Sequence, residues 1–379
     1  MKGYLIQRIL EAISGLKEIS ALLDGIRREG GLLAGPDLER IRSRAYEAAN
    51  AYGREAADYL AAVRDAYRYG YGDDAEEIAR LSLALQGAGG MAAELAGQYI
   101  AATDRAFQLG GSVARLAELL DGTAAVSSRN AIGLSELTEA MSLAGPLAAS
   151  LGLGADEAAA ALGTIASAAG QGGQEAAASL EGILLNIRQV ADEGEGVSAE
   201  GIREFEAACR SLGVSLEETR DGAIALRSPM DVLGELSEAY STLGPDDPRR
   251  SGLLEALGGS QAEALDALLS NYGAYEKMLG DYAGGVGSLS AQAGLAADSW
   301  EASMSRLSGT WEEALGNIAD PAAVSSVLDA LDGVLSATAG ITEALGPLGS
   351  LGLGAGLLAS LKDVGREGTY SPMDMPTAA

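Results

Sequence analysis

The sequence predicts an all-α protein, made of long helical hairpins and a small-residue helical bundle, and leaves open a short β-hairpin near residues 213–227. Apolar residues recur every three or four positions through most of the 379 residues, which is the period of one face of an α-helix. Hydrophobic residues make up 47% of the chain and aromatic residues only 4%. A core of alanine, leucine, isoleucine and valine suits closely packed helices better than sheets.

Residues 1–72 are expected to form a coiled-coil-like helical hairpin. Apolar side chains follow the helical spacing over residues 4–28, and a glycine-rich segment then breaks the pattern. A second continuous helix is predicted over residues 37–68, with a period close to a heptad. The tyrosine-rich segment YRYGYGDD at 67–74 ends it, and aromatic packing at a helix end is favoured there over a contact surface.

A helical domain is expected over residues 73–285. Its first helices are predicted at 75–86, 91–121 and 134–149. The joints between them are marked by glycines, namely Gly87, Gly89, Gly90, Gly110, Gly111 and Gly122. Ser135 is the candidate N-cap of the third helix. Pro146 should kink or end that helix because it supplies no amide hydrogen.

Residues 151–191 read as two small-residue helices, joined through Gly170, Gly172 and Gly173. Alanine and glycine beside the apolar positions let two backbones approach closely, so a tight antiparallel pair is predicted. The apolar faces consist of Ala158, Ala161, Leu162, Ile165 and Ala169 in the first helix and Leu180, Ile183, Leu184 and Ile187 in the second.

The segment that follows carries three local signals. Cys209 falls on an apolar helical face and is predicted to be a buried structural thiol rather than a reactive one. Residues 214–216 and 224–226 can pair across the Asp221–Gly222 turn as the β-hairpin. Ser228 followed by Pro229 is a helix start, with a capping residue and a proline at the first position.

Residues 286–361 are expected to hold a long helix followed by apolar C-terminal helices. A continuous apolar stripe from Leu289 to Ile318 carries both tryptophans, which favours a helix interface. The stretch at 344–361 is uncharged and near the minimum length of a membrane span, although its glycine and proline content favours a buried or peripheral hairpin. Residues 362–379 are predicted to be a disordered tail.

Composition excludes several classes of function. The formal net charge of −28 excludes a general attraction to nucleic acid, because such proteins neutralise phosphates with lysine and arginine. The chain has no histidine, so it lacks the usual general base and the commonest neutral zinc ligand. No phosphate-binding loop occurs, and nothing places Glu181 or Glu206 in a cleft as a glycosidase would require. The sequence therefore predicts no enzyme, and no catalytic, cofactor-binding or metal-ligating residue.

Four blocks then occur in a characteristic order. They are residues 134–180, beginning LSELTEAMSLAG; SPMDVLGEL at 228–236; LLEALGGSQAEALDALLSNYGAYEKML at 253–279; and SWEASMSRLSGTWEEALGNI at 299–318. From about 90 to 320 the chain thus resembles the helical domain of the tape measure proteins of long-tailed bacteriophages and prophages, a family also described as minor tail proteins. Where the family usually has Ala-Gly-Thr, this chain has Ala176, Ala177 and Ala178, which puts a close contact made by that glycine in doubt.

The resemblance implies a structural role in the virion. Such a protein fills the tail lumen in several copies, sets tail length during assembly in the host cytoplasm, and leaves ahead of the DNA at genome ejection. The implied partners are the tail tube protein, tail assembly chaperones and the distal tail protein. Members commonly continue past segments like Asp363–Gly365, so the chain is expected to be an N-terminal portion, a short member or a truncated reading frame.

Two other functions stay open from the sequence. A membrane-active helical protein would contact or perforate the host bilayer through residues 344–361. An unrecognised hydrolase would act on cell-wall glycan.

Overall fold

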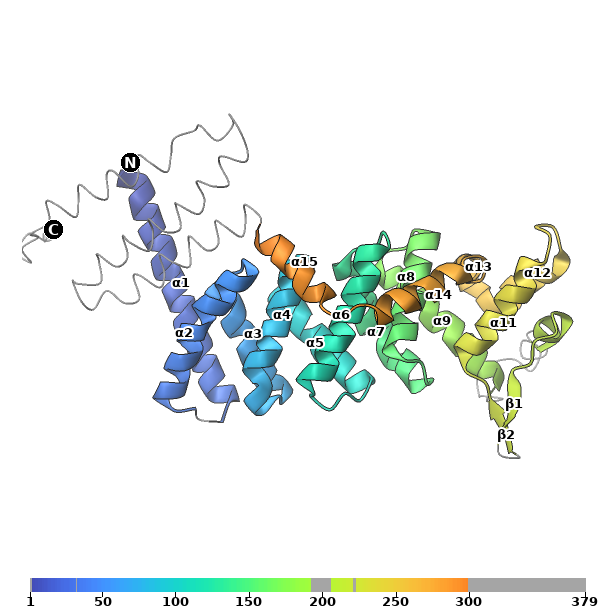
Figure 1. Cartoon of the computed structure of the whole chain (residues 1–379), viewed down its shortest axis with the longest axis horizontal. Coiled ribbons are helices and arrows are strands. Elements are labelled where there is room, and N and C mark those ends of the chain that lie inside the picture. The colour runs from blue at the N-terminus through green and yellow to red at the C-terminus, as the bar shows by residue number, and fades with distance from the viewer. Residues whose placement is uncertain (1, 32, 192–205, 221–222, 299–379) are drawn as a thin grey trace, which may run out of the picture.

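The computed structural model describes residues 2–31, 33–191, 206–220 and 223–298, and within these ranges it confirms the all-α prediction. The helices follow one another along an elongated array, as Figure 1 shows. The first nine are α1 (Lys2–Glu29), α2 (Gly35–Tyr52), α3 (Ala56–Tyr69), α4 (Ala75–Gly89), α5 (Ala93–Ala106), α6 (Val113–Arg129), α7 (Leu134–Ser150), α8 (Ala155–Ala169) and α9 (Gly173–Ala191). The later elements are β1 (Glu217–Arg220), β2 (Ala223–Leu226), α11 (Pro229–Ser241), α12 (Pro248–Leu253), α13 (Ala262–Ser270), α14 (Tyr272–Ala283) and α15 (Ser288–Ala297).

The array has two layers of helices. The odd-numbered helices pack in a row, α1 on α3, α3 on α5, α5 on α7 and α7 on α9, and the even-numbered helices from α2 to α8 form the second layer. Helices α2, α4, α6 and α8 begin at residues 35, 75, 113 and 155. This is a helix-pair repeat of roughly 40 residues, the period of known helical solenoids. Each repeat can bury its apolar face only against its neighbours, and the buried side chains form two clusters, one over α1 to α4 and a larger one from the end of α3 to α15.

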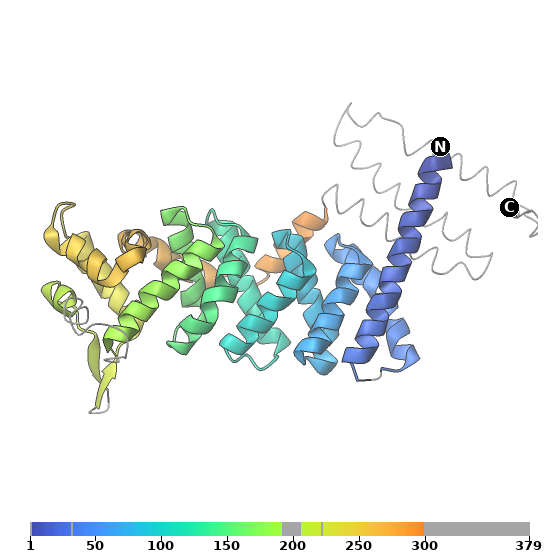
Figure 2. The ribbon, with the colours of Figure 1, turned by 180° about the vertical axis from the view of Figure 1, so that it is seen from behind.

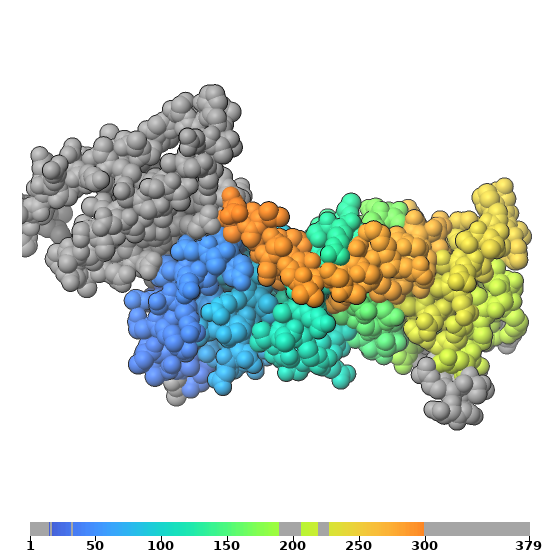
Figure 3. All heavy atoms as spheres, viewed as in Figure 1, coloured from blue at the N-terminus to red at the C-terminus, as the bar shows by residue number. Residues whose placement is uncertain are grey.

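The chain then reverses and covers the even-numbered layer. Helix α13 packs on α8, α14 packs on α8 and α6, and α15 packs on α4, α6 and α2. In Figure 3 the segment from α13 to α15 crosses the surface of the array, and in the opposite view of Figure 2 it lies behind. The last described residues therefore lie beside the first third of the array, far from their sequence neighbours α11 and α12.

Helix α8 lies at the centre of this arrangement. All nine residues from Ala158 to Ala166 are buried, because α7 and α9 pack on one side of the helix while α13 and α14 cover the other. A helix that is apolar on every face is the kind that a protein interior accepts. The single apolar face predicted from spacing is thus part of a central stretch, residues 158–166, that is buried on every side, while Asp156, Ser167 and Ala168 nearer the ends are exposed.

The predicted hairpin at 151–191 is confirmed as α8 and α9, with the break at Gly170–Gly172. Helix α9 contacts α8 but packs most extensively on α7. The close approach occurs at Gly173, where a Cβ would overlap the backbone carbonyl oxygen of Glu136 on α7. Ala176 and Ala177, where the family usually has a glycine nearby, are both buried without such a clash.

The continuous helix predicted over 37–68 is wrong, because the chain forms two helices there. Gly53 takes a left-handed φ of 64° and ends α2. Glu55 then begins α3 with its amide donating to Asp58 at 3.3 Å. A left-handed glycine followed by a capping pair stops a helix even where the apolar period continues.

The helix predicted over 91–121 is also two helices, α5 and α6. The turn between them carries Gly110 and Gly111, both with positive φ, whereas Gly122 lies inside α6 rather than at a joint. The N-cap predicted at Ser135 is Gly133, whose amide donates to Glu136. Helix α7 also continues through Pro146 to Ser150 rather than ending there.

The β-hairpin is confirmed, with a shift in its first strand. Strands β1 and β2 pair antiparallel, with Glu217 opposite Leu226 and Arg220 opposite Ala223. The first strand therefore starts at Glu217, after the predicted residues 214–216. The helix predicted after Ser228 is confirmed as α11, with Pro229 at its first turn.

Several predictions fall on residues that the structure does not describe. The stripe predicted from Leu289 starts in α15, and its continuation past residue 298 lies outside the described ranges, as do 344–361 and 362–379. Among the helices that are described, none has the length and hydropathy needed to cross a bilayer. The predicted domain boundaries remain predictions.

Candidate binding pocket

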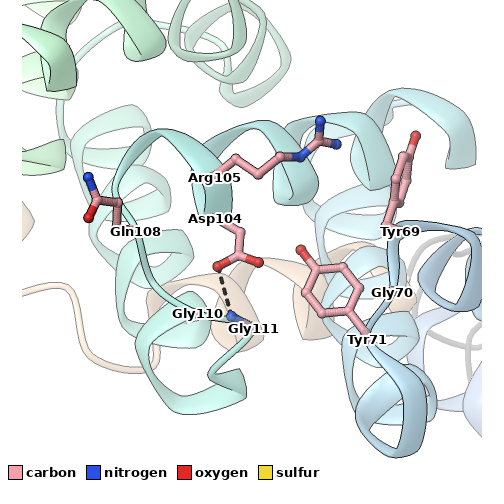
Figure 4. A pocket seen from close by; sticks show the side chains of 8 residues that line it. All are labelled: Tyr69, Gly70, Tyr71, Asp104, Arg105, Gln108, Gly110 and Gly111. Atoms are coloured by element: carbon pink, nitrogen blue, oxygen red, sulfur yellow. Dashed lines mark hydrogen bonds between the residues drawn. The ribbon is translucent and has the colours of Figure 1, made fainter.

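An open hollow lies where the C-terminal ends of α3 and α5 meet. Its volume is about 370 Å³, and Figure 4 shows the side chains around it. The residues that line it are Tyr69, Gly70, Tyr71, Asp104, Arg105, Gln108, Gly110 and Gly111.

The local sequence explains the shape of this pocket. Gly70 ends α3 with a φ of 94°, and after α5 the chain turns through Gln108, Gly110 and Gly111 with φ values of 51°, 71° and 72°. Gln108 is the non-glycine residue with positive φ among the described residues. Asp104 closes the turn, because its Oδ1 accepts from the Gly111 amide at 2.9 Å. A side chain forced into the left-handed region is held there by the surrounding structure.

The side chains of the pocket are aromatic and charged. The Arg105 guanidinium lies 5.9 Å from the centre of the Tyr69 ring, and Arg68 lies 5.3 Å from the same ring on the rim. Burial, followed by the negative charge of Asp104, raises the pKa of Tyr71 above its ordinary value of 10. The Tyr71 hydroxyl is therefore protonated at neutral pH and can donate a hydrogen bond but cannot serve as a base. This chemistry suits recognition of a side chain or peptide more than catalysis.

A second hollow lies between α11 and α14 and is acidic. Its volume is about 500 Å³, and four carboxylates line it: Asp231, Glu235, Glu238 and Glu276. Arg227 binds both oxygens of Glu235, at 2.6 and 2.8 Å, and this contact is the main reason why the pKa of Glu235 is lowered. Within the described ranges, no cluster of three or more acidic or cysteine side chains is arranged to hold a metal ion.

Some of the residues singled out by sequence line the first pocket, and others lie outside both hollows. Cys209 is buried with 1% of its surface exposed, and burial raises the pKa of its thiol to about 12, so the prediction of a structural thiol is confirmed. Glu181 lies on α9, half-buried and outside both hollows. The tyrosine segment packs at the end of α3 as predicted, and Tyr69 and Tyr71 also line the pocket. Sequence could not pair them with the turn at 108–111, which is close only in the fold.

One comparison with known proteins gives a result. A family model described as "Phage-related minor tail protein" matches residues 45–259, more than half of the chain. No curated protein and no solved structure matches. The matched interval starts within α2 and ends just after α12, so it includes the helix pairs from α4 to α9, the first pocket and β1–β2.

Proposed function

Because the chain belongs to the phage-related minor tail protein family, and is thus a structural component of the virion tail, we propose that it is a tape measure that fills the tail lumen and sets tail length. It acts through packing and length and not through catalysis. The observation that carries the proposal is the one-dimensional order of the array, in which helix pairs follow one another along its long axis (Figure 1). In such a fold, adding or removing a repeat changes the length of the array.

The net charge supports a further part of the proposal, in which the protein leaves the tail ahead of the DNA at genome ejection. A net charge of −28 repels the phosphates of the genome, so the protein does not bind DNA that follows it through the tail. The proposed partners are the tail tube protein, the assembly chaperones and the distal tail protein, with several copies of this chain in each tail.

In-frame deletion of one helix pair in the phage tests the ruler role. Removal of residues 113–152 takes out α6 and α7 and joins the loop before α6 to the loop before α8. If the chain measures the tail as an extended helix, the tail shortens by roughly 60 Å, because a helix rises about 1.5 Å per residue. If it measures as a folded array, the loss is about 10 Å, the distance between packed helices. Electron microscopy of purified tails gives the length.

A matched variant separates length from packing. Leu162→Ala keeps the number of residues unchanged but weakens the core at α8, so it is expected to leave tail length unchanged. Duplication of 113–152 should lengthen the tail. Tails of unaltered length in both the deletion and the duplication would refute the ruler role.

A further inference from the structure

The returning helices occupy a groove that repeats along the even-numbered layer. Each of three successive even helices presents a glycine to this segment: Gly87 on α4 faces Ala293, Gly122 on α6 faces Tyr282, and Gly163 on α8 faces Met278. A Cβ at Gly122 would lie 2.5 Å from the nearest atom of the Tyr282 ring, and one at Gly163 would lie 2.8 Å from the Met278 sulfur. Gly122 and Gly163 therefore leave room for side chains of α14, whereas a Cβ at Gly87 would only touch Ala293 of α15, at 3.8 Å.

The two helices are held very differently. Tyr275 and Met278 of α14 are buried, and the ring of Tyr282 lies against Gly122. Polar contacts add to this, because Arg129 on α6 donates to the Asp281 carbonyl at 3.2 Å and Lys277 contacts both Asp281 and Asn130. Helix α14 is therefore anchored by large side chains and by an ion-paired cluster.

Helix α15 is short, and its buried side chains are smaller than those of α14. Its buried side chains are Leu289, Ala293 and Ala297, whereas Leu295 is 76% exposed. Val286, between the two helices, is 87% exposed and is followed by Gly287, which has a φ of 79°. Gly285, in contrast, is buried against the backbone of Asp121 and Gly122 on α6. An isolated helix of ten residues is unstable in water, so α15 depends on its dock.

A small number of polar contacts hold α15 in place. The Asp121 carboxylate on α6 accepts from the amides of Gly287 and Leu289, at 2.7 and 3.0 Å, and thereby caps the start of the helix. Gln292 donates to the Ala124 carbonyl at 2.9 Å. Asp121 is thus a cap supplied by another helix, and capping is lost whenever α15 leaves its groove.

We propose that α15 is a displaceable strap, which opens at Val286 and Gly287, after the anchored Gly285, while α14 stays docked. Opening uncovers the faces of α4 and α6 around Gly87. Helix α14 buries a tyrosine and a methionine, whereas α15 buries one leucine and two alanines. A segment that buries less apolar surface opens at a lower cost in free energy, which places this opening at α15 rather than at α14. The inference does not depend on the tape measure role.

Hydrogen exchange of the full-length protein, followed by mass spectrometry, tests the strap. Amides of 288–297 are expected to exchange at least tenfold faster than those of α14. Asp121→Ala removes the cap and should speed exchange in α15 a further fivefold to tenfold without changing α14. Asp121→Asn, which can still accept a hydrogen bond, should fall between the two. Glu118→Ala, an exposed acid on the same helix, controls for the loss of one charge.

A disulfide closes the strap reversibly. A Cβ at Gly87 would lie 3.8 Å from the Cβ of Ala293, which is the usual separation in a disulfide. The oxidised Gly87→Cys/Ala293→Cys protein should exchange in α15 as slowly as in α14, and its reduced form should return to the fast rate. Equal exchange of α14 and α15 in the unaltered protein, or equal acceleration of both by Asp121→Ala, would overturn the proposal.

Discussion

Gly173 is the position where a single added methyl group should separate two helices of the array. In Gly173→Ala the new Cβ would overlap the rigid backbone carbonyl of Glu136, whereas ordinary contacts begin at 3.4 Å. Helix α9 must therefore move from α7 by about 1 Å, and overpacking of this kind costs about 1–3 kcal/mol. Alanine restricts the unfolded chain more than glycine does, which offsets about 0.4–1 kcal/mol of this loss in the free energy of unfolding. The expected net loss in the free energy of unfolding is about 1–2 kcal/mol.

The neighbouring residue gives a matched control. A Cβ at Gly172 meets no atom within 4 Å, and Gly172 does not have positive φ. In Gly172→Ala, the lower conformational entropy of the unfolded chain stabilises the fold, whereas replacing a good N-cap residue destabilises it. These two effects have similar sizes, so the free energy of unfolding should hardly change. Both variants are measured by urea unfolding followed by far-UV circular dichroism. Equal stability of Gly172→Ala and Gly173→Ala would refute the close approach of α9 to α7.

Three further predictions concern the core. Leu162→Ala should lower the free energy of unfolding by about 3 kcal/mol, because Leu162 is fully buried in a helix enclosed on all sides, and a loss below about 1 kcal/mol would contradict that enclosure. Glu76→Gln should cost about 1–2 kcal/mol in the same urea assay, because glutamine can still accept from the Tyr59 hydroxyl but loses the charge that pairs with Arg44 at 2.9 Å and Arg40 at 3.3 Å. Glu77→Gln at the exposed next position should have little effect. Burial raises the pKa of Cys209 from 9.0 to about 12, so this thiol contributes stability that is present below pH 9 and is lost as the pH rises from 9 towards 12. Urea unfolding across that pH range should therefore show a flatter decline in stability for Cys209→Ala than for the unaltered protein. A thiol reagent at pH 8 should react only with unfolded protein.

Helix positions and buried faces could largely be predicted from sequence, and breaks could not. The apolar period identified the faces of α7, α8 and α9, because burial on one side imposes that period whatever the partner is. The same period continues across Gly53, where α2 ends and α3 begins, so spacing alone predicted one helix. Glycines also serve two purposes that spacing cannot separate: Gly111 forms a turn, whereas Gly122 lies inside α6 to receive a tyrosine ring.

The pocket lay beyond the reach of sequence for a similar reason. Tyr71 and Asp104 are adjacent only because α3 and α5 pack as neighbours in the odd-numbered layer. Each residue is unremarkable in its own segment. A glycine-rich turn near 110 and a tyrosine cluster near 70 were visible, but nothing in either segment indicated that they face each other.

The sequence by itself determined that this protein is helical, acidic and without histidine, and its blocks indicated the tail protein family. Those properties follow from composition and local period, which each residue carries with it. Tertiary structure alone decided that the helices form two layers, and that α14 and α15 return to cover the even-numbered layer. Helices lined with small side chains can pack against many other helices, so the local sequence does not determine which helices pair. The pairing depends on contacts across the fold, such as those of Gly87 with Ala293 and of Gly163 with Met278.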